Sequence, residues 1–154
     1  MFVSLDEKRK EEEKAGENDK TLCADRLEKM GLLYRTLVLA CDGNTTEALM
    51  SDQFYMNFFG ALEYLPEIKG KLLCREFFEK CKFKEVVPIE NEQVLKKIHL
   101  CYRVNFIKET IFAKEDGQVS QSLACICLNL TIEILRNLLQ DVDYLRKVVQ
   151  ETQL

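Results

Sequence analysis

The 154-residue chain has little of what interrupts helices, since it contains only two prolines and six glycines. Proline breaks a helix and glycine weakens one, so their scarcity allows long uninterrupted helices. Long apolar runs are missing too: none approaches the roughly 20 residues needed to cross a bilayer. Residues 1–5 form only a short apolar stretch and charged residues follow directly, so we expect no secretory signal peptide.

What the chain does contain is typical of a globular protein. A hydrophobic fraction of 47% and a charged fraction of 31% exclude global disorder. The length is sufficient for one domain with a core of its own. The net charge of -4 argues against a general nucleic-acid binder, which is usually basic.

Seven cysteines, an odd number, occur in a sequence that otherwise reads as intracellular. No Cys-x-x-Cys pair is present and there is only one histidine, so we expect no zinc site and no other metal or cofactor. Most of the cysteines fall on apolar helical faces, where a reduced thiol packs as a small hydrophobe. We therefore predict reduced core thiols at Cys23, Cys41, Cys74, Cys81, Cys101, Cys125 and Cys127.

The charge pattern divides the chain into two parts. Residues 6–20 are almost all charged, with both signs interspersed, and predict that residues 1–20 form a charged, disordered leader. Residues 21–154 then form the helical domain. Its first helix is expected to start at Thr21 as N-cap and to run to about Cys41, with Gly43 as a left-handed C-terminal cap.

The remaining apolar periodicity predicts further helices, several of them opened by a capping side chain. Asp52, Asn91 and Asp141 are the expected caps. On the longest helix, Tyr102 and Asn105 belong to the predicted inner face and Arg103 to a basic outer face. The expected helices cover residues 45–50, 53–63, 73–82, 92–113, 120–139 and 142–152.

The segment from Asp52 to Ile89 is an aromatic-rich joint between helices. It holds both prolines and six of the nine phenylalanines. Pro88 forces the preceding residue into an extended conformation, so Lys82–Ile89 is expected to cross the surface as an extended linker. Phe83 and Val86 are expected to be tucked in, and the outward residues to be Lys82, Lys84 and Glu85.

Two segments of the chain resemble each other and suggest an internal repeat. Each has an apolar helix, a break at an aspartate (Asp52 or Asp141) and a second helix opened by it. The equivalent Tyr55 and Tyr144 are 89 residues apart, about twice the roughly 40–47 residues of an armadillo or HEAT repeat. The pattern favours an all-α fold, an armadillo/HEAT-like helical solenoid fragment, over a closed bundle.

The joint and the following long helix are similar to the SMEK domain of the protein phosphatase 4 regulatory subunit 3 family. The resemblance covers about residues 27–149. Leu65 and Cys74 depart from the usual acidic residue and histidine of the family, which indicates a divergent member. The similar motifs are Ser51-Asp52 with Tyr55-Met56, Phe59 to Glu67 (Phe-Gly-Ala-Leu-Glu-Tyr-Leu-Pro-Glu), Arg75-Glu76-Phe77, Lys82 to Ile89 (Lys-Phe-Lys-Glu-Val-Val-Pro-Ile), Lys97-Ile98-His99 and Tyr102-Arg103.

The resemblance implies a non-catalytic regulatory or scaffold subunit of a serine/threonine phosphatase, found in nucleus and cytoplasm. The implied partners are the phosphatase 4 catalytic subunit and its scaffold subunit. Family members usually also carry a pleckstrin-homology-like domain and an acidic tail, so the chain is expected to be either a fragment or a reduced paralogue. Candidate partner-binding residues are the outward residues of the joint and the next helix: Lys82, Lys84, Glu85 and Arg103.

Two other classes of function are weighed against this one. An enzyme with a cysteine nucleophile would have to use His99, the only histidine, but no glycine-rich turn accompanies any cysteine, so we expect no enzyme and no catalytic residues. A helical-repeat adaptor unrelated to phosphatases is compatible with the pattern. We expect neither nucleic-acid nor membrane binding, and we expect exposed solenoid ends to self-associate.

Overall fold

The computed structural model describes residues 5–40, 42–68, 70, 72–81, 83–113 and 117–152, with side chains from residue 22 onward. All regular elements within these ranges are helices, which confirms the all-α class; the armadillo or HEAT repeat type stays a prediction. The helices are α1 (Leu5–Leu39), α2 (Gly43–Leu49), α3 (Tyr55–Leu62), α4 (Cys74–Lys80), α5 (Glu92–Thr110), α6 (Gly117–Gln140) and α7 (Val142–Thr152).

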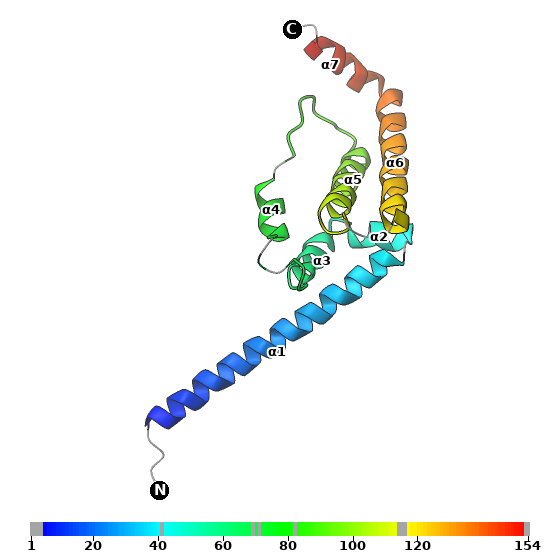
Figure 1. The fold of residues 1–154 in the computed structure, drawn as a ribbon. Helices are drawn as coiled ribbons and strands as arrows, with labels where there is room; N and C mark the ends of the chain where they lie inside the picture. Colours follow the sequence, from blue (N-terminus) through cyan, green and yellow to red (C-terminus); the bar gives the residue numbers. More distant parts are fainter. Residues whose placement is uncertain are drawn as a thin grey trace.

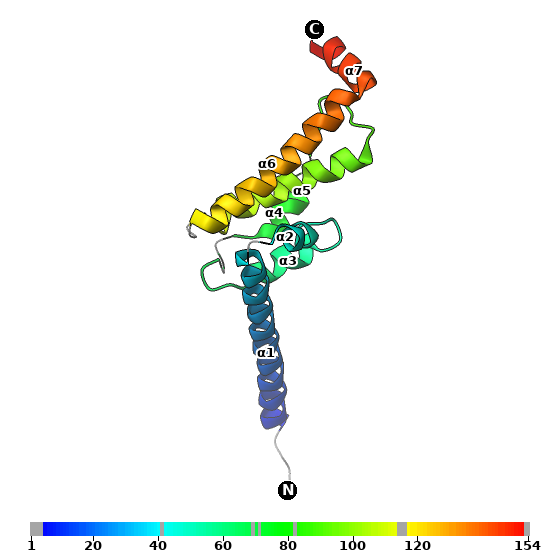
Figure 2. The same ribbon diagram turned by 90° about the vertical axis from the view of Figure 1, so that its right-hand side faces the viewer.

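Two helix pairs organise the molecule (Figure 1). α5 and α6 run antiparallel side by side, and α1 packs across α3. The N-terminal half of α1 extends beyond the other helices, and α7 leaves the end of α6 at an angle (Figure 2). The helices are therefore laid out as an open array: α2 and α3 lie between α1 and α5, and α4 lies next to α3 on the side of α5 away from α6.

Helix α1 begins upstream of the expected start at Thr21, since its backbone is helical from Leu5. The division of the chain at residue 20 stays a prediction. Near its other end α1 packs closely on α3: a Cβ added to Gly31 would lie 2.6 Å from the carbonyl oxygen of Ala61. Only a residue without a side chain allows the two backbones to approach so closely.

Gly43 does not cap α1, which corrects the sequence interpretation. Asp42, the residue before it, is the N-cap of α2: its Oδ2 accepts a hydrogen bond of 2.9 Å from the backbone N–H of Thr45. Gly43 is the first residue of α2, and Gly70 is the glycine with positive φ (74°) among those described. An aspartate three residues before threonine satisfies the first orphan amides, so a new helix starts at once.

The predicted caps are correct at Asn91 and Asp141 and wrong at Asp52. Asn91 Oδ1 accepts from the amides of Gln93 and Val94 at 3.0 and 3.3 Å. Asp141 Oδ1 accepts from Tyr144 at 2.9 Å. Helix α3, in contrast, follows Phe54 without any side-chain cap, because the Asp52 carboxylate is bonded elsewhere. The two halves of the proposed repeat thus differ at this aspartate.

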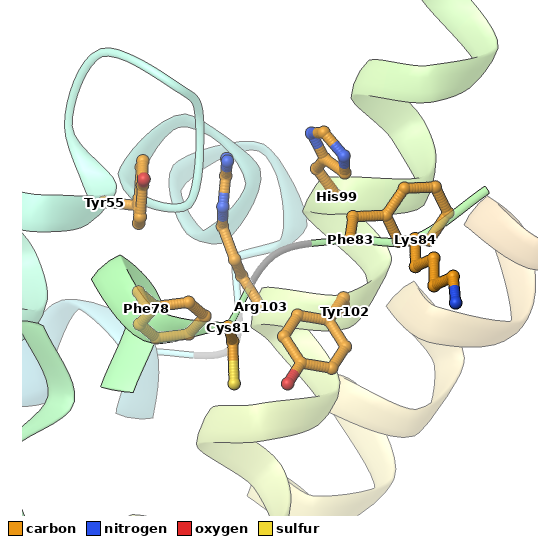
Figure 3. A pocket seen from close by; sticks show the side chains of 8 residues that line it. All are labelled: Tyr55, Phe78, Cys81, Phe83, Lys84, His99, Tyr102 and Arg103. Carbon is orange, nitrogen blue, oxygen red and sulfur yellow. The ribbon is translucent and has the colours of Figure 1, made fainter. Parts of the chain in front are cut away.

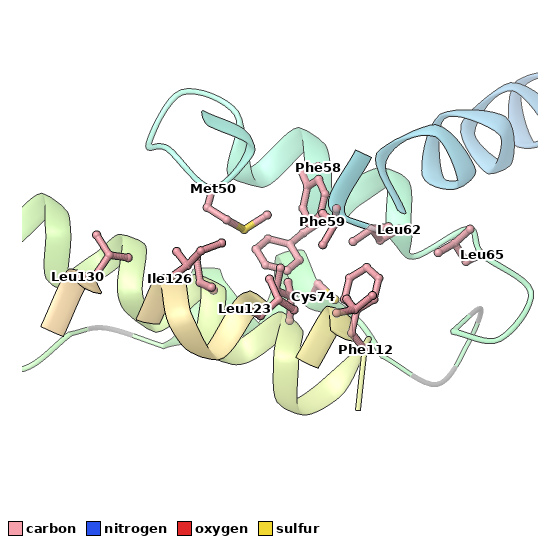
Figure 4. Packing of buried hydrophobic residues seen from close by; sticks show 14 residues of the cluster. Met50, Phe58, Phe59, Leu62, Leu65, Cys74, Phe112, Leu123, Ile126 and Leu130 are labelled. Atoms are coloured by element: carbon pink, nitrogen blue, oxygen red, sulfur yellow. The ribbon is translucent and has the colours of Figure 1, made fainter. Parts of the chain in front are cut away.

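The core lies where α3, α5 and α6 meet the end of α1 (Figure 4). Phe58, Phe59 and Leu62 of α3 are fully buried in it. Burying such a side chain stabilises the fold by about 1.5–3 kcal/mol. The other fully buried large side chains are Val38, Met50, Leu65, Val94, Val104, Ile107, Phe112 and Leu123.

Helix α6 carries two apolar stripes on opposite sides. The inner stripe, Val119, Leu123, Ile126 and Leu130, is buried. With about 3.6 residues per turn, the other stripe faces away from it and is exposed. That outer stripe consists of Leu128, Ile132, Leu135 and Leu139.

By length and composition alone, α6 is suited to cross a membrane, although no contiguous apolar run of that size exists. An 18-residue window has a mean hydropathy of 1.5 and is only 17% buried. Polar residues interrupt the apolar ones along α6. The mean hydropathy of the window is therefore high, although every uninterrupted apolar run is short. The expected absence of membrane binding therefore stays a prediction.

Candidate docking site

Helices α3, α4 and α5 meet in an aromatic cluster. The rings of Phe59 and Phe78 are 4.6 Å apart between centroids, and those of Phe77 and Phe106 are stacked at 4.9 Å. Such pairs contribute about 0.5–1.5 kcal/mol beyond their buried area. The cluster confirms an aromatic joint and fixes the faces of α4 and α5 that border the site.

An ion pair holds α3 against α4. Arg75 donates to Glu63 through its backbone N–H at 2.7 Å and through Nη2 at 3.0 Å. This bonding raises the pKa of Arg75 further, so the guanidinium stays charged. Gly60 lies beneath it, where an added Cβ would come within 3.0 Å of the Arg75 side chain. The start of α4 is thereby positioned by a side chain at the end of α3.

Arg103 of α5 is buried, with 7% of its surface exposed, although it was predicted to face outward. Its Nη1 donates to the Met50 carbonyl at the end of α2 at 2.8 Å, and its Nη2 donates to Asp52 Oδ1 at 2.7 Å. The guanidinium carbon lies 3.8 Å from the ring centroid of Tyr55. A buried guanidinium needs such partners, and here three of them converge.

The predicted inner face of α5 is rotated accordingly. Tyr102 is 49% exposed and Asn105 is exposed, whereas Arg103 and Val104 are buried. The sequence pattern placed Arg103 on the solvent-facing side of the helix because its side chain is charged. The carbonyl of Met50 and the carboxylate of Asp52, both remote in sequence, make its burial favourable.

Above this ion pair lies a pocket of about 400 Å³ (Figure 3). Helix α5 contributes His99, Tyr102 and Arg103, whose spacing of three and four residues places them on one face. The remaining walls come from α3, from α4 and from the residues that follow α4. Those lining residues are Tyr55, Phe78, Cys81, Phe83 and Lys84.

The pocket is aromatic, with a cationic rim. The Phe83 ring meets the His99 ring edge-on at 5.3 Å, and Nε2 of His99 is buried without a hydrogen-bond partner in the described structure. Lys84 makes no ion pair with any described residue, and none of the described lining residues carries a carboxylate. Burial, and then the Cys81 thiol, raises the pKa of Tyr102, so its hydroxyl stays protonated.

A second hollow of about 380 Å³ adjoins the first, between the linker and α7. Phe83 and Lys84 line both hollows. Glu85 also lines the second one and is held in place, because its Oε2 accepts a 2.8 Å hydrogen bond from the amide of Ile89. An ion pair between Lys147 and Glu90 ties α7 to the end of the linker.

The linker is irregular as predicted, but its apolar residues are not tucked in. Val86 is 86% exposed and Phe83 is 50% exposed. Phe83 rests its edge on His99 rather than entering the core. The aromatic cluster of α4 and α5 is built from other rings, such as Phe78 and Phe106.

Of the four candidate binding residues, the structure brings two into one pocket. Lys84 is at the rim and Arg103 at the base, while Glu85 borders the neighbouring hollow and Lys82 lies outside the described residues. Sequence reasoning missed the other lining residues as a group. A usable signal existed in the motif around Lys97-Ile98-His99 and Tyr102-Arg103, whose spacing predicts one shared helical face.

The cysteines are free in the described structure, but fewer lie in the core than predicted. Cys74 is buried, and burial raises its pKa to about 12. Cys23, Cys81 and Cys125 are exposed, and Cys41 lies outside the described residues. Their helices have apolar faces that are themselves uncovered, so the apolar pattern overstated burial.

Cys101 and Cys127 face each other between α5 and α6. Cys101 Sγ lies 3.7 Å from the Cys127 carbonyl oxygen and 3.7 Å from Thr131 Oγ1. A hydrogen bond between the two thiols lowers the pKa of Cys101 and raises that of Cys127. The pair is a second site of unusual chemistry, separate from the pocket.

No catalytic arrangement connects the pocket's nucleophile and base. Cys81 and His99 both line it, but within the described residues the thiol interacts with the Tyr102 hydroxyl and no hydrogen bond joins it to the imidazole. The described residues also contain no group of three histidine, cysteine or acidic side chains suited to hold a metal.

Known proteins resemble this chain over most of its length. It is 26% identical over 125 residues to Suppressor of Mek1 of Dictyostelium discoideum, covering 79% of this chain. It is 30% identical over 108 residues to Protein PPP4R3C1 of Mus musculus, covering 67%. It is 28% identical over 122 residues to Serine/threonine-protein phosphatase 4 regulatory subunit 3 of Drosophila melanogaster, covering 75%.

The chain spans only 12–13% of the length of these relatives. No solved structure matches it. The family described as Phosphatase 4 regulatory subunit 3 matches residues 15–153, which is nearly the whole chain. The chain therefore belongs to the phosphatase 4 regulatory subunit 3 family.

Proposed function

We propose that the chain acts as a non-catalytic docking segment of a phosphatase 4 complex. Its partners in this proposal are the phosphatase 4 catalytic subunit and its scaffold subunit. The observation that carries the proposal is the family match over residues 15–153. The open helical array supports it, because an array of this kind presents long surfaces to other proteins.

Partner contacts are proposed at the linker rim, where charged side chains are available. Lys84 lies between the two hollows and has no ion pair with a described residue, and Glu85 borders the hollow beside α7. Arg103 contributes indirectly by positioning Tyr55 in the pocket wall, since its guanidinium is buried under that ring. Distribution between nucleus and cytoplasm is proposed on the family alone.

Affinity capture tests this function. The tagged chain is expected to retain the phosphatase 4 catalytic and scaffold subunits from lysate at low salt, identified by mass spectrometry. The variant Lys84→Glu with Glu85→Lys keeps the net charge and is expected to retain less of both. Lys96→Glu, on an exposed part of α5 outside both hollows, changes the net charge by two units and controls for charge effects away from the linker.

Two results would contradict the proposal. One is the absence of both subunits from the captured material while the chain remains folded by circular dichroism. The other is phosphate-ester hydrolysis that follows the purified chain through every column. Capture of unrelated proteins without phosphatase 4 would instead favour a helical-repeat adaptor of another system.

A further inference from the structure

The two hollows adjoin each other, because Phe83 and Lys84 line both of them. We refer to the space beside α5 and the space beside α7 together as the groove. Each hollow, at about 400 and 380 Å³, lies near the lower end of the range for ligand pockets. Two such spaces joined in a row fit successive side chains of an extended chain better than one compact molecule.

The charges along the groove are arranged asymmetrically. In the first hollow the cation of Arg103 is already matched by Asp52, but Lys84 is not matched by any described residue. The second hollow is walled by Val86, Val87 and Val148, with the acidic residues at its side being Glu85 and Glu151. An anionic group is thus favoured near Lys84 and disfavoured farther toward α7.

The walls of the first hollow select for apolar or aromatic side chains. Tyr55, Phe78 and Tyr102 present ring surfaces, and Tyr102 is about half exposed. A cationic guest such as a methylated lysine, which aromatic walls otherwise attract, is repelled by Lys84. Large apolar anchors in such pockets dominate the affinity of most protein interfaces.

His99 supplies an unsatisfied polar group in the same place. Its Nε2 is buried and has no partner in the described structure, and the half-exposed Phe83 ring meets the imidazole edge-on at 5.3 Å between centroids. A buried polar atom without a partner is costly. A guest that shifts Phe83 and offers a backbone carbonyl or amide to this nitrogen relieves that cost.

From these features we propose that the groove binds an extended segment of another protein. Its large apolar or aromatic side chain enters between Tyr55, Phe78 and Tyr102, its neighbouring carboxylate meets Lys84, and a second apolar side chain lies against α7. This inference rests on the proposed function, in which the chain works by binding other proteins. It goes further by naming the kind of peptide sequence that the groove recognises.

Selection from a display library of short random peptides tests the inference. The purified full chain is the bait, and the enriched peptides are resynthesised and titrated by fluorescence anisotropy. Enriched peptides are expected to combine an aromatic or large aliphatic residue with an adjacent Asp or Glu. Replacing that acid by lysine, or replacing Lys84→Glu in the chain, is expected to weaken binding about five-fold.

A charge swap makes the test specific. The lysine-bearing peptide is expected to regain affinity for the Lys84→Glu chain, because the same contact is restored with its signs reversed. Lys96→Glu changes the same charge on the exposed side of α5 and is expected to alter affinity by less than about two-fold. Because Lys84 is exposed and has no ion pair with a described residue, its replacement is expected to leave the fold intact, which circular dichroism checks.

Several results would overturn the inference. These are no enriched sequence, enrichment of basic peptides, equal losses for Lys84→Glu and Lys96→Glu, or failure of the charge swap. The peptide-binding inference and the proposed function can fail independently. Capture of phosphatase 4 subunits without peptide binding would refute only the peptide-binding inference. Peptide binding without capture of phosphatase 4 would refute only the proposed complex.

Discussion

Arg103 Nη2 lies 2.7 Å from Asp52 Oδ1, joining two residues that are 51 positions apart in the chain. The bond anchors α5 to the segment between α2 and α3, and the same guanidinium also closes the end of α2 through the Met50 carbonyl. A cation at a helix C-terminus is favoured by the helix dipole. This single side chain therefore fixes the floor of the pocket.

Replacing Arg103→Met is expected to lower the free energy of unfolding by about 2 kcal/mol, because hydrogen bonds to a charged group contribute about 1.5–3 kcal/mol. Asp52 is half exposed, so water recovers part of its lost interaction. Urea unfolding monitored by circular dichroism measures the change. Arg146→Met removes an exposed ion pair with Asp143 and is expected to cost under about 0.5 kcal/mol. Equal costs for the two variants would refute the structural role of Arg103.

Gly31→Ala is expected to destabilise the protein by about 1–2 kcal/mol. The added methyl group would lie 2.6 Å from the Ala61 carbonyl oxygen and force α1 away from α3, which outweighs the gain of about 1 kcal/mol in helix propensity. Gly117→Ala is the control, since no atom lies within 4 Å of its added Cβ. Denaturant titration should show a lower free energy of unfolding for Gly31→Ala than for Gly117→Ala. A Gly31→Ala protein as stable as the wild type would contradict the packing of α1 on α3.

Cys101 is expected to react with iodoacetamide faster than Cys127 at neutral pH. Hydrogen bonding to the Cys127 thiol lowers the pKa of Cys101, so its reactive thiolate is populated at a pH where an ordinary thiol is still protonated. The rate at Cys101 should already level off near neutral pH. Peptide mapping of the alkylated protein measures both sites.

The variant Cys127→Ala removes the donor that stabilises the Cys101 thiolate. The pH dependence of alkylation at Cys101 should then move to higher pH. Cys125→Ala, an exposed neighbour on α6, is the control and should leave it unchanged. A profile that is the same in all three proteins would show that the thiol pair has no effect on Cys101.

The outer stripe of α6 is expected to cause self-association. Its side chains are exposed at four positions in a helical array, and apolar faces of this kind associate. Ile132→Glu combined with Leu135→Glu should reduce the mass measured by light scattering after size exclusion. Val86→Glu changes an apolar residue that is even more exposed but lies in the linker rather than on α6, and it should leave the mass unchanged. A wild-type chain that is monomeric at all concentrations would show this prediction to be wrong.

Local sequence patterns predicted the helices and two of the expected N-caps. Asn91 and Asp141 cap the helices that they were expected to cap, because N-cap chemistry involves only the next two or three residues. Asp52 has the same local pattern and does not cap α3. Its carboxylate has a stronger partner in Arg103, which lies far away in sequence and is invisible to any local pattern.

The candidate site was only partly predictable for the same reason. Lys84 was correctly expected at an exposed edge of the joint, but Arg103 was placed in solvent on account of its charge and Tyr102 in the core on account of its ring. Both assignments follow average burial preferences. The pocket reverses them, because Arg103 finds hydrogen-bonding partners at Met50 and Asp52 and Tyr102 lines the pocket wall.

By itself the sequence determined the all-α class, the family and most helix boundaries, since each depends on periodicity, capping or motif residues close together in the chain. The tertiary structure decided which face of α5 is buried, which stripe of α6 is left open and where the pocket lies. Those features depend on pairing between residues far apart, such as Arg103 with Asp52 and Gly31 with Ala61. The free energy of such pairs exists only once the helices are packed.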